Sequence, residues 1–138
     1  MSNTQHNSTE ENTLNNTWNM WYHHEKDNWK ITGYRQFYTI KTIEDFWKMF
    51  NNWDKVGGIT SKHFFLMKKN ITPIWEDPNN INGGCWSFKV QEDQAYNLFE
   101  ELAIHMICDK LCPYSSENNL DEILGLSICL KTLHPMRA

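Results

Sequence analysis

Residues 70–86 read NITPIWEDPNNINGGCW, and this segment places Trp75 directly before the acids Glu76 and Asp77. Two prolines and a pair of glycines disfavour regular helix or strand, so the segment is expected to form a loop. A protruding indole can stack on a flat ring, and a neighbouring carboxylate can accept hydrogen bonds from donors on that ring's edge. From the loop alone, two interpretations are open: a ring-binding site, or an indole that closes over the core beside a solvated acid.

A ring-binding loop needs a rigid support, and the chain carries patterns of both strands and helices. Aromatic and β-branched runs predict strands near Trp18 and Trp21 and at residues 35–40, 63–67, 85–90 and 123–131. A capping-box pattern predicts a helix over about 42–52, and Asp93 is expected to cap a second helix that ends near Leu111. This mixture favours an α+β domain with a mostly antiparallel sheet and helices on one face.

The composition suits a single domain with a short polar tail. The chain has 138 residues, 40% of them hydrophobic and 14% aromatic, and no apolar run long enough to cross a membrane. Residues 1 to about 14 are polar and low in complexity, which predicts a disordered tail before one domain over 15–138. A net charge of -4 argues against coating long nucleic acid, because phosphate neutralisation drives such binding, but a single-nucleotide ligand stays open.

The cysteines and histidines form no pattern typical of a cofactor site. Cys85, Cys108, Cys112 and Cys129 make no C-x-x-C pair and nothing resembles a secretion signal, so reduced thiols in a cytoplasmic protein are expected. His105 shares a helical face with two of these cysteines, but zinc needs a fourth ligand, and thiols at a helix end are favoured. The sequence also lacks a nucleophile–base pair and a phosphate-binding loop. We therefore expect no metal, no cofactor and no enzymatic activity.

Each predicted helix carries a core stripe and apolar residues beside or opposite it. The stripes consist of Phe46, Met49, Phe50 and Trp53 in the first helix and Ala95, Leu98, Phe99, Leu102 and Met106 in the second. Ile43 and Trp47 lie at the edge of the first stripe, and Ile104 lies on the other side of the second helix. Single exposed apolar residues are normal, so these are either incidental or parts of one docking patch.

Five motifs follow one another along the chain. They are TWNMW at 17–21, an isolated Trp29, TIEDFWKMFN at 42–51, ITPIWEDPNNINGGCW at 71–86 and EILGLSICLK at 122–131. In order and spacing they resemble the translation initiation factor 4E family, which binds the methylated guanine cap of messenger RNA. The resemblance implies a curved, mostly antiparallel sheet with helices on its convex face and the cap site on its concave side.

The resemblance also implies the residues of the cap site. Trp29 and Trp75 would sandwich the base, and Glu76 would bind its edge. Methylation at N7 makes guanine cationic, which favours stacking on electron-rich indole, and one carboxylate can accept from the adjacent N1–H and N2–H2 donors. The tryptophans on predicted strands are interpreted as structural: Trp18, Trp21 and Trp86.

For the helical side, the resemblance implies a protein partner. Family members bind there a short helical motif of the 4G scaffold and of 4E-binding proteins, with a tyrosine, four variable residues, a leucine and another apolar residue. The positions carried over to this groove are Leu14, Ile43, Trp47, Glu101 and Ile104. Glu101 is expected to accept a hydrogen bond from the ligand or to bind a basic residue.

The phosphate side departs from the family pattern. Lys131 keeps one basic position, but Cys85 stands in place of an arginine and Leu133 in place of another basic residue. The sequence stops at Ala138, before further strands and a third helix of the family, so a shortened member is expected. The abundance of Asn, Ile and Lys is typical of an A/T-rich genome and suggests that this member is viral. Two functions stay open: a cap-binding module that recruits the translation machinery, and an adaptor or decoy with weak or no cap binding.

Overall fold

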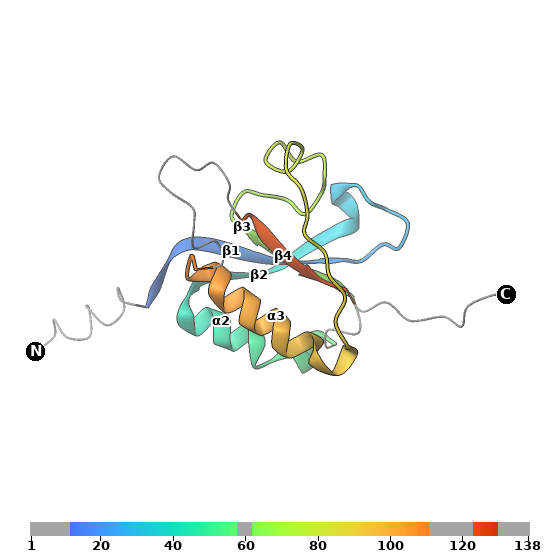
Figure 1. Ribbon diagram of the computed structural model, residues 1–138. Coiled ribbons are helices and arrows are strands. Elements are labelled where there is room, and N and C mark those ends of the chain that lie inside the picture. The colour runs from blue at the N-terminus through green and yellow to red at the C-terminus, as the bar shows by residue number, and fades with distance from the viewer. Residues whose placement is uncertain (1–11, 58–61, 111–122, 130–138) are drawn as a thin grey trace, which may run out of the picture.

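A computed structural model describes residues 12–57, 62–110 and 123–129. These residues form a four-stranded antiparallel sheet in the order β2-β1-β3-β4, with two helices on one face (Figure 1). The elements are β1 Thr13–His23, β2 Tyr34–Thr42, α2 Ile43–Phe50, β3 His63–Lys68, α3 Glu92–Ile107 and β4 Gly125–Ile128, with short 3-10 helices η1 Ile31–Gly33 and η2 Trp53–Val56. The predicted α+β class is confirmed. In the described part of the chain, no helix is long and apolar enough to span a membrane.

Helix α2 begins where the sequence predicts, because Thr42 and Asp45 cap each other's backbone. The Asp45 backbone N–H donates to Thr42 Oγ1 at 3.1 Å, and the Thr42 backbone N–H donates to Asp45 Oδ2 at 3.1 Å. The Tyr38 hydroxyl donates to the Asp45 carbonyl at 2.8 Å, and the Tyr96 hydroxyl donates to the Phe50 carbonyl. Both ends of α2 are therefore tied to neighbouring elements, which fixes its apolar face toward the core.

The core lies between the sheet and the helices. The largest fully buried side chains are Trp18, Met20, Ile40, Phe46, Phe50, Phe64 and Leu66. The predicted stripe of the first helix is buried in full, and it continues into Trp53 of η2. Trp18 and Trp21 lie on β1 as predicted, the first 1% exposed and the second half-buried.

The core face of α3 includes Ala95, Phe99 and Met106 of the predicted stripe but is rotated about the helix axis from it. Its buried residues are Ala95, Phe99, Ala103, Met106 and Ile107. The predicted stripe is therefore wrong at Leu98 and Leu102, which are half-buried. The Phe99 ring stacks on Phe50 of α2 with centroids 5.8 Å apart, and the buried side of α3 beside it carries Ala103 and Ile107 in place of Leu98 and Leu102.

The ends of α3 also differ from the prediction. The helix starts at Glu92 after Gln91, so Asp93 lies in the first turn and does not cap it. It ends at Ile107, before Leu111, because Asp109 leaves the helical conformation. Asp109 has a φ of 60°, and its N–H donates to the Met106 carbonyl at 3.1 Å.

The largest difference from the predicted fold lies at residues 85–90, which form no strand. Strand β3 pairs with β1 on one side and with β4 on the other, so both of its edges are occupied. Residues 81–90 are all exposed, and Trp86 is 94% exposed. The interpretation of Trp86 as a structural residue is therefore wrong. The segment has the apolar–polar alternation of a strand, but a strand also needs a free edge of the sheet with which to pair, and the pattern does not show whether one exists.

Gly125 allows β4 to pair closely with β3. A Cβ added at Gly125 would lie 2.3 Å from Met67 Sδ and 2.9 Å from the Leu66 carbonyl oxygen of β3. Any larger residue would therefore push the strands apart. The strand is shorter than the predicted 123–131, and residues 130–138 lie outside the described part of the chain.

Candidate functional site

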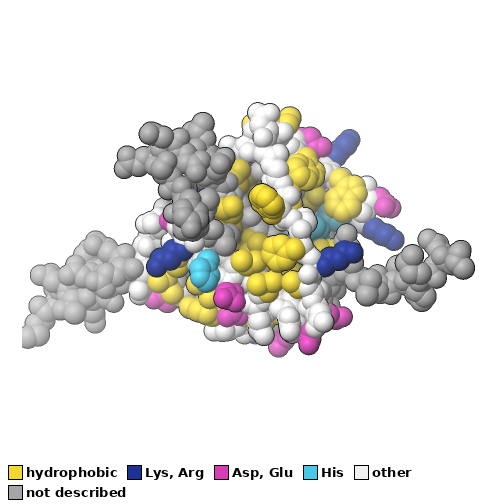
Figure 2. All heavy atoms as spheres, viewed as in Figure 1, with side chains coloured by type: hydrophobic (Ala, Val, Ile, Leu, Met, Phe, Trp, Pro, Cys, Tyr) yellow, Lys and Arg dark blue, Asp and Glu magenta, His cyan; other side chains and the backbone are white. Residues whose placement is uncertain are grey.

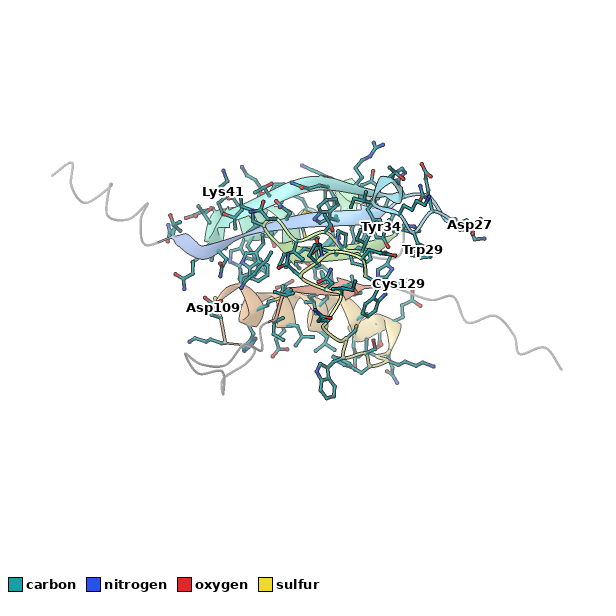
Figure 3. The ribbon with its side chains drawn as sticks, turned by 90° about the horizontal axis from the view of Figure 1, so that it is seen from above. Asp27, Trp29, Tyr34, Lys41, Asp109 and Cys129 are labelled. Carbon is teal, nitrogen blue, oxygen red and sulfur yellow. The ribbon has the colours of Figure 1, made fainter. Side chains whose placement is uncertain are left out.

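Two loops lie on the side of the sheet that α2 and α3 leave uncovered (Figure 1). The Trp29 loop, residues 24–33, joins β1 to β2, and the Trp75 loop, residues 69–84, follows β3. Trp29 and Tyr34 lie next to each other at one end of the sheet, and Lys41 and Asp109 lie at the other end (Figure 3). Trp29 and Tyr34 thus lie at the end of the sheet opposite Lys41, which precedes the cap residue of α2.

The Trp29 loop is organised around Asn28. The Asn28 side-chain amide donates to Glu25 Oε2 at 2.9 Å and to Thr32 Oγ1 at 3.0 Å. The loop closes where the His24 backbone N–H donates to the Gly33 carbonyl at 2.8 Å. Apart from the short 3-10 helix η1 at its end, these bonds take the place of regular secondary structure and give the loop a defined backbone at Trp29.

Gly33→Ala is expected to lower the free energy of unfolding by about 1–3 kcal/mol and to weaken any binding that uses Trp29. A Cβ at Gly33 would lie 2.0 Å from the Asn28 carbonyl oxygen, which cannot move without shifting the peptide that leads into Trp29. Gly84→Ala is the matched control, because a Cβ there meets no atom within 4 Å. Thermal unfolding of both variants measures the difference. Equal midpoints would contradict this role of Gly33.

The indole of Trp29 is 58% exposed, with one face covered. The imidazole of His23, at the end of β1, stacks on it with ring centroids 4.0 Å apart and planes 8° apart. The Tyr34 ring lies 6.5 Å away and is tilted. Because a stacked neighbour covers only one face of a flat ring, the other face of Trp29 is accessible to a ligand.

The Trp75 loop is anchored by Asp77, a buried carboxylate that is only 6% exposed. Asp77 Oδ2 accepts from the Thr72 backbone N–H at 2.8 Å and from Thr72 Oγ1 at 2.7 Å, and Oδ1 accepts from the Asn79 backbone N–H at 2.8 Å. Burial alone would raise the pKa of Asp77, but these hydrogen bonds outweigh it and lower the pKa to about 2. No role for Asp77 was predicted from the sequence, although the Asp-x-Asn spacing is a signal of an Asx turn.

The residues before Asp77 project from this anchored loop. Trp75 is 65% exposed and Glu76 is exposed. The interpretation of Trp75 as a lid over the core is therefore wrong. Further exposed hydrophobic side chains follow along the chain before α3, and Figure 2 shows hydrophobic side chains over the loops as well as over the helices. Those before α3 are Ile81, Trp86, Phe88 and Val90.

Tyr34 connects the two loops electrostatically. Burial raises the pKa of the Tyr34 phenol above its ordinary value, and the negative charge of Glu76 raises it further. The same Tyr34 ring borders Trp29, so the phenol whose pKa responds to Glu76 belongs to the aromatic group around the first indole. Among the described residues, the rings of Trp29 and Trp75 make no contact with each other. The two indoles are thus separate and exposed in the free protein.

The predicted partner residues lie on the helical side. Ile43 and Trp47 of α2 are 41% and 38% exposed, and the edge of Trp47 packs on Phe46 with centroids 5.0 Å apart. Ile104 of α3 and Leu14 of β1 are half-buried and pack against the core. The remaining member, Glu101, is exposed on α3. An exposed indole that rests on a buried ring is a surface feature typical of protein interfaces.

Of the residues that bear on phosphate binding, only Cys85 is described. Its thiol is exposed. Lys131 and Leu133 lie outside the described residues. In the described part of the chain, no group of three or more His, Cys, Asp or Glu side chains is arranged to hold a metal ion.

The fold and the loops together define a class of protein: a small α+β module that presents two exposed indoles and a carboxylate on one side of its sheet. The family model of eukaryotic initiation factor 4E matches residues 13–134 of the sequence. Because this match covers most of the chain, the chain belongs to the eukaryotic initiation factor 4E family.

Curated relatives agree with this assignment. Eukaryotic translation initiation factor 4E of Dictyostelium discoideum is 28% identical over 141 residues, which cover 91% of this chain and 54% of the relative. Eukaryotic translation initiation factor 4E-3 of Caenorhabditis elegans is 32% identical over 83 residues, which cover 59% of this chain and 33% of the relative. The matched part of the chain thus spans between a third and about half of these relatives.

Solved structures share the fold. The C. elegans eIF4E-3 complex with the 4E-binding protein Mextli and a cap analogue superposes with a TM-score of 0.72 at 26% identity, covering 87% of this chain and 68% of that one. Ascaris suum eIF4E-3 in complex with the m2,2,7G cap gives a TM-score of 0.68 at 27% identity, covering 87% and 67%. These structures share the described sheet and helices and extend beyond them.

Proposed function

We propose that this protein binds the 7-methylguanosine cap of messenger RNA and recruits translation initiation machinery through its helical side. The observation that carries the proposal is the position of Trp29, Trp75 and Glu76. All three are exposed on loops on the side of the sheet away from the helices. Solved relatives in complex with cap analogues support it.

In the proposed complex, the base lies between the indoles of Trp29 and Trp75. Stacking on an aromatic side chain contributes roughly 1–3 kcal/mol per base. The positive charge of the methylated ring adds a cation–π component, which neutral guanine lacks. Glu76 accepts from the N1–H and N2–H2 donors of the base edge, with charge assistance. The same carboxylate favours a cationic ring over a neutral one.

Both loops supply anchored backbones, and the base joins two indoles that are apart in the free protein. Asn28 and Asp77 hold the loops from within, so little backbone ordering is required when the ligand enters. Lys131 is the proposed phosphate ligand, whereas Cys85 provides no positive charge. We therefore assign more of the affinity to the base than to the phosphates.

Retention on a resin that carries 7-methyl-GTP tests this function. The full chain should be retained, and free 7-methyl-GTP, but not GTP, should elute it. A folded chain that passes through the resin would contradict cap binding. It would favour the adaptor or decoy function, for which the exposed Trp29 and Trp75 loops are not needed.

The proposed partner is a helical motif of a 4G-type scaffold or a 4E-binding protein. It would occupy a groove formed by Leu14, Ile43, Trp47, Glu101 and Ile104. Solved relatives in complex with 4E-binding proteins support this. A helix laid on this surface would bury the exposed Ile43 and Trp47, which is the usual mode of helix-in-groove binding. We further propose that the protein acts in the cytoplasm and is not an enzyme.

Trp47→Ala is expected to weaken binding of such a helical peptide by at least about tenfold, because exposed tryptophans at interfaces are typical hot spots. The peptide should carry the tyrosine, four variable residues, leucine and apolar residue of the motif. Trp86→Ala is the matched control, because Trp86 is exposed but lies outside α2 and α3. Fluorescence anisotropy of a labelled peptide measures both variants. Unchanged binding by Trp47→Ala would contradict the groove.

A further inference from the structure

We propose that His23 is a positioning residue that supports Trp29 from behind, so that the rings in the bound state stack in the order His23, Trp29, base and Trp75. The inference rests on the proposed cap-binding function and adds to it a residue that need not touch the ligand. It concerns how the Trp29 indole is held ready in the free protein.

The ring geometry shows which face of Trp29 is available. The His23 imidazole and the Trp29 indole are nearly parallel, 8° apart, with centroids at 4.0 Å. That is the separation of rings in direct contact, so a base cannot enter between them. Since Trp29 is nevertheless 58% exposed, the base must stack on the face that points away from His23.

His23 itself is fixed more firmly than a loop residue. It pairs with Tyr34 of β2 and with His63 of β3, so its backbone is held on both sides. Its Nε2 lies 2.7 Å from the Asn28 carbonyl oxygen. Because a carbonyl only accepts, Nε2 carries the proton and donates it. This carbonyl belongs to the peptide that leads into Trp29, so His23 holds both the backbone and the ring of the loop.

A row of aromatic contacts extends this support into the sheet. The His23 and Tyr34 ring centroids are 4.9 Å apart, and the Tyr34 and Phe65 centroids are 5.4 Å apart. The row therefore runs from β3 through β2 and β1 to Trp29. Figure 3 shows Tyr34 beside Trp29 at this end of the sheet. An exposed indole without such support would sample several rotamers and would have to be ordered when the ligand binds.

His23→Ala is expected to weaken binding of 7-methyl-GTP roughly two- to twelvefold, which is the range for loss of one aromatic pair. His23→Phe keeps a stacked ring and should stay within about twofold of the wild type. His23→Gln keeps a donor but no ring, so its affinity should fall as in His23→Ala. A loss of affinity in His23→Phe as large as in His23→Ala would show that stacking on Trp29 is not how residue 23 contributes to binding.

A spectroscopic measurement tests the stacking without ligand. Fluorine NMR of the chain labelled with 5-fluorotryptophan resolves its 7 tryptophans, and Trp29→Phe assigns the signal of Trp29. His23→Ala should shift this signal, because the imidazole ring current is lost, whereas His23→Phe should leave it perturbed by a ring. The signals of buried Trp18 and Trp53 should not move, which shows that the variants are folded.

Different results would contradict cap binding and the role of His23. A wild-type chain that does not bind 7-methyl-GTP contradicts the proposed function. A wild-type chain that binds, together with His23→Ala of unchanged affinity, contradicts the role of His23 alone. An unchanged Trp29 signal in His23→Ala would likewise overturn the inference, since the rings would then not be stacked in solution.

Discussion

Trp75→Ala is expected to weaken binding of 7-methyl-GTP roughly 5- to 150-fold without lowering thermal stability. The indole is 65% exposed, so its removal takes little packing from the core, whereas the bound base loses one of its two stacking surfaces. The loss should be larger for 7-methyl-GTP than for GTP, because only the methylated base is cationic. Isothermal titration calorimetry with both nucleotides measures the two affinities.

Trp86→Ala is the matched control for this prediction. Trp86 follows the same loop and is more exposed than Trp75, but it takes no part in the proposed site. The control should bind 7-methyl-GTP as the wild type does. If both variants lose affinity equally, the effect is not one of stacking on Trp75. If neither does, Trp75 is not part of the ligand site.

Asp77→Ala is expected to produce the largest loss of stability, about 2–4 kcal/mol, together with weaker cap binding. The substitution leaves the N–H groups of Thr72 and Asn79 without the acceptor that they share. Because these groups shape the turn that carries Trp75 and Glu76, the indole and the carboxylate would lose their fixed positions. Urea unfolding gives the stability, and calorimetry gives the affinity.

The same carboxylate predicts a dependence of stability on pH. The pKa of Asp77 is lowered from 3.8 to about 2 in the folded protein, so folding favours the charged form. This stabilisation is complete above the unfolded pKa of 3.8 and is lost as the pH falls through about 2. The free energy of unfolding of the wild type should therefore fall more steeply with acid than that of Asp77→Ala.

Asp27→Ala serves as the control for both effects, because Asp27 is an exposed acid on the Trp29 loop. It should change neither the stability nor its slope with pH by more than about 0.5 kcal/mol. An Asp77→Ala chain as stable as this control would contradict the anchoring role. Loss of stability without loss of cap affinity would show that the loop keeps its shape without Asp77.

The parts of the fold that depend on local sequence could be predicted. The capping box at Thr42 and Asp45 predicted the start of α2, since both partners lie within one helical turn. The stripe of α2 was also correct, because a short helix with one apolar face has only one way to bury it. The last predicted strand, residues 123–131, contains β4, and Gly125 at its start allows the close pairing with β3.

The predictions of the fold were wrong where contacts between residues distant in the sequence determine the structure. Residues 85–90 have the pattern of a strand, but β4 occupies the edge of β3 that this segment would need. The pattern within α3 identified Phe99 as buried, but it did not show that Ala103 and Ile107 are buried with it in place of Leu98 and Leu102, because that depends on how the helix packs on the core. In the candidate site, Trp75 and Glu76 were visible as unusual neighbours in one loop. The support of Trp29 by His23 could not be predicted, because it depends on how the end of β1 packs against the loop that follows it.

Tryptophan fluorescence tests most directly whether a methylated guanine stacks between the indoles of Trp29 and Trp75. The full chain should be titrated with 7-methyl-GTP, and in parallel with GTP, while its emission is recorded. We expect saturable quenching by 7-methyl-GTP, much weaker quenching by GTP, and loss of the signal change in Trp75→Ala. A folded chain whose emission does not saturate with 7-methyl-GTP, or responds equally to both nucleotides, would contradict this stacking.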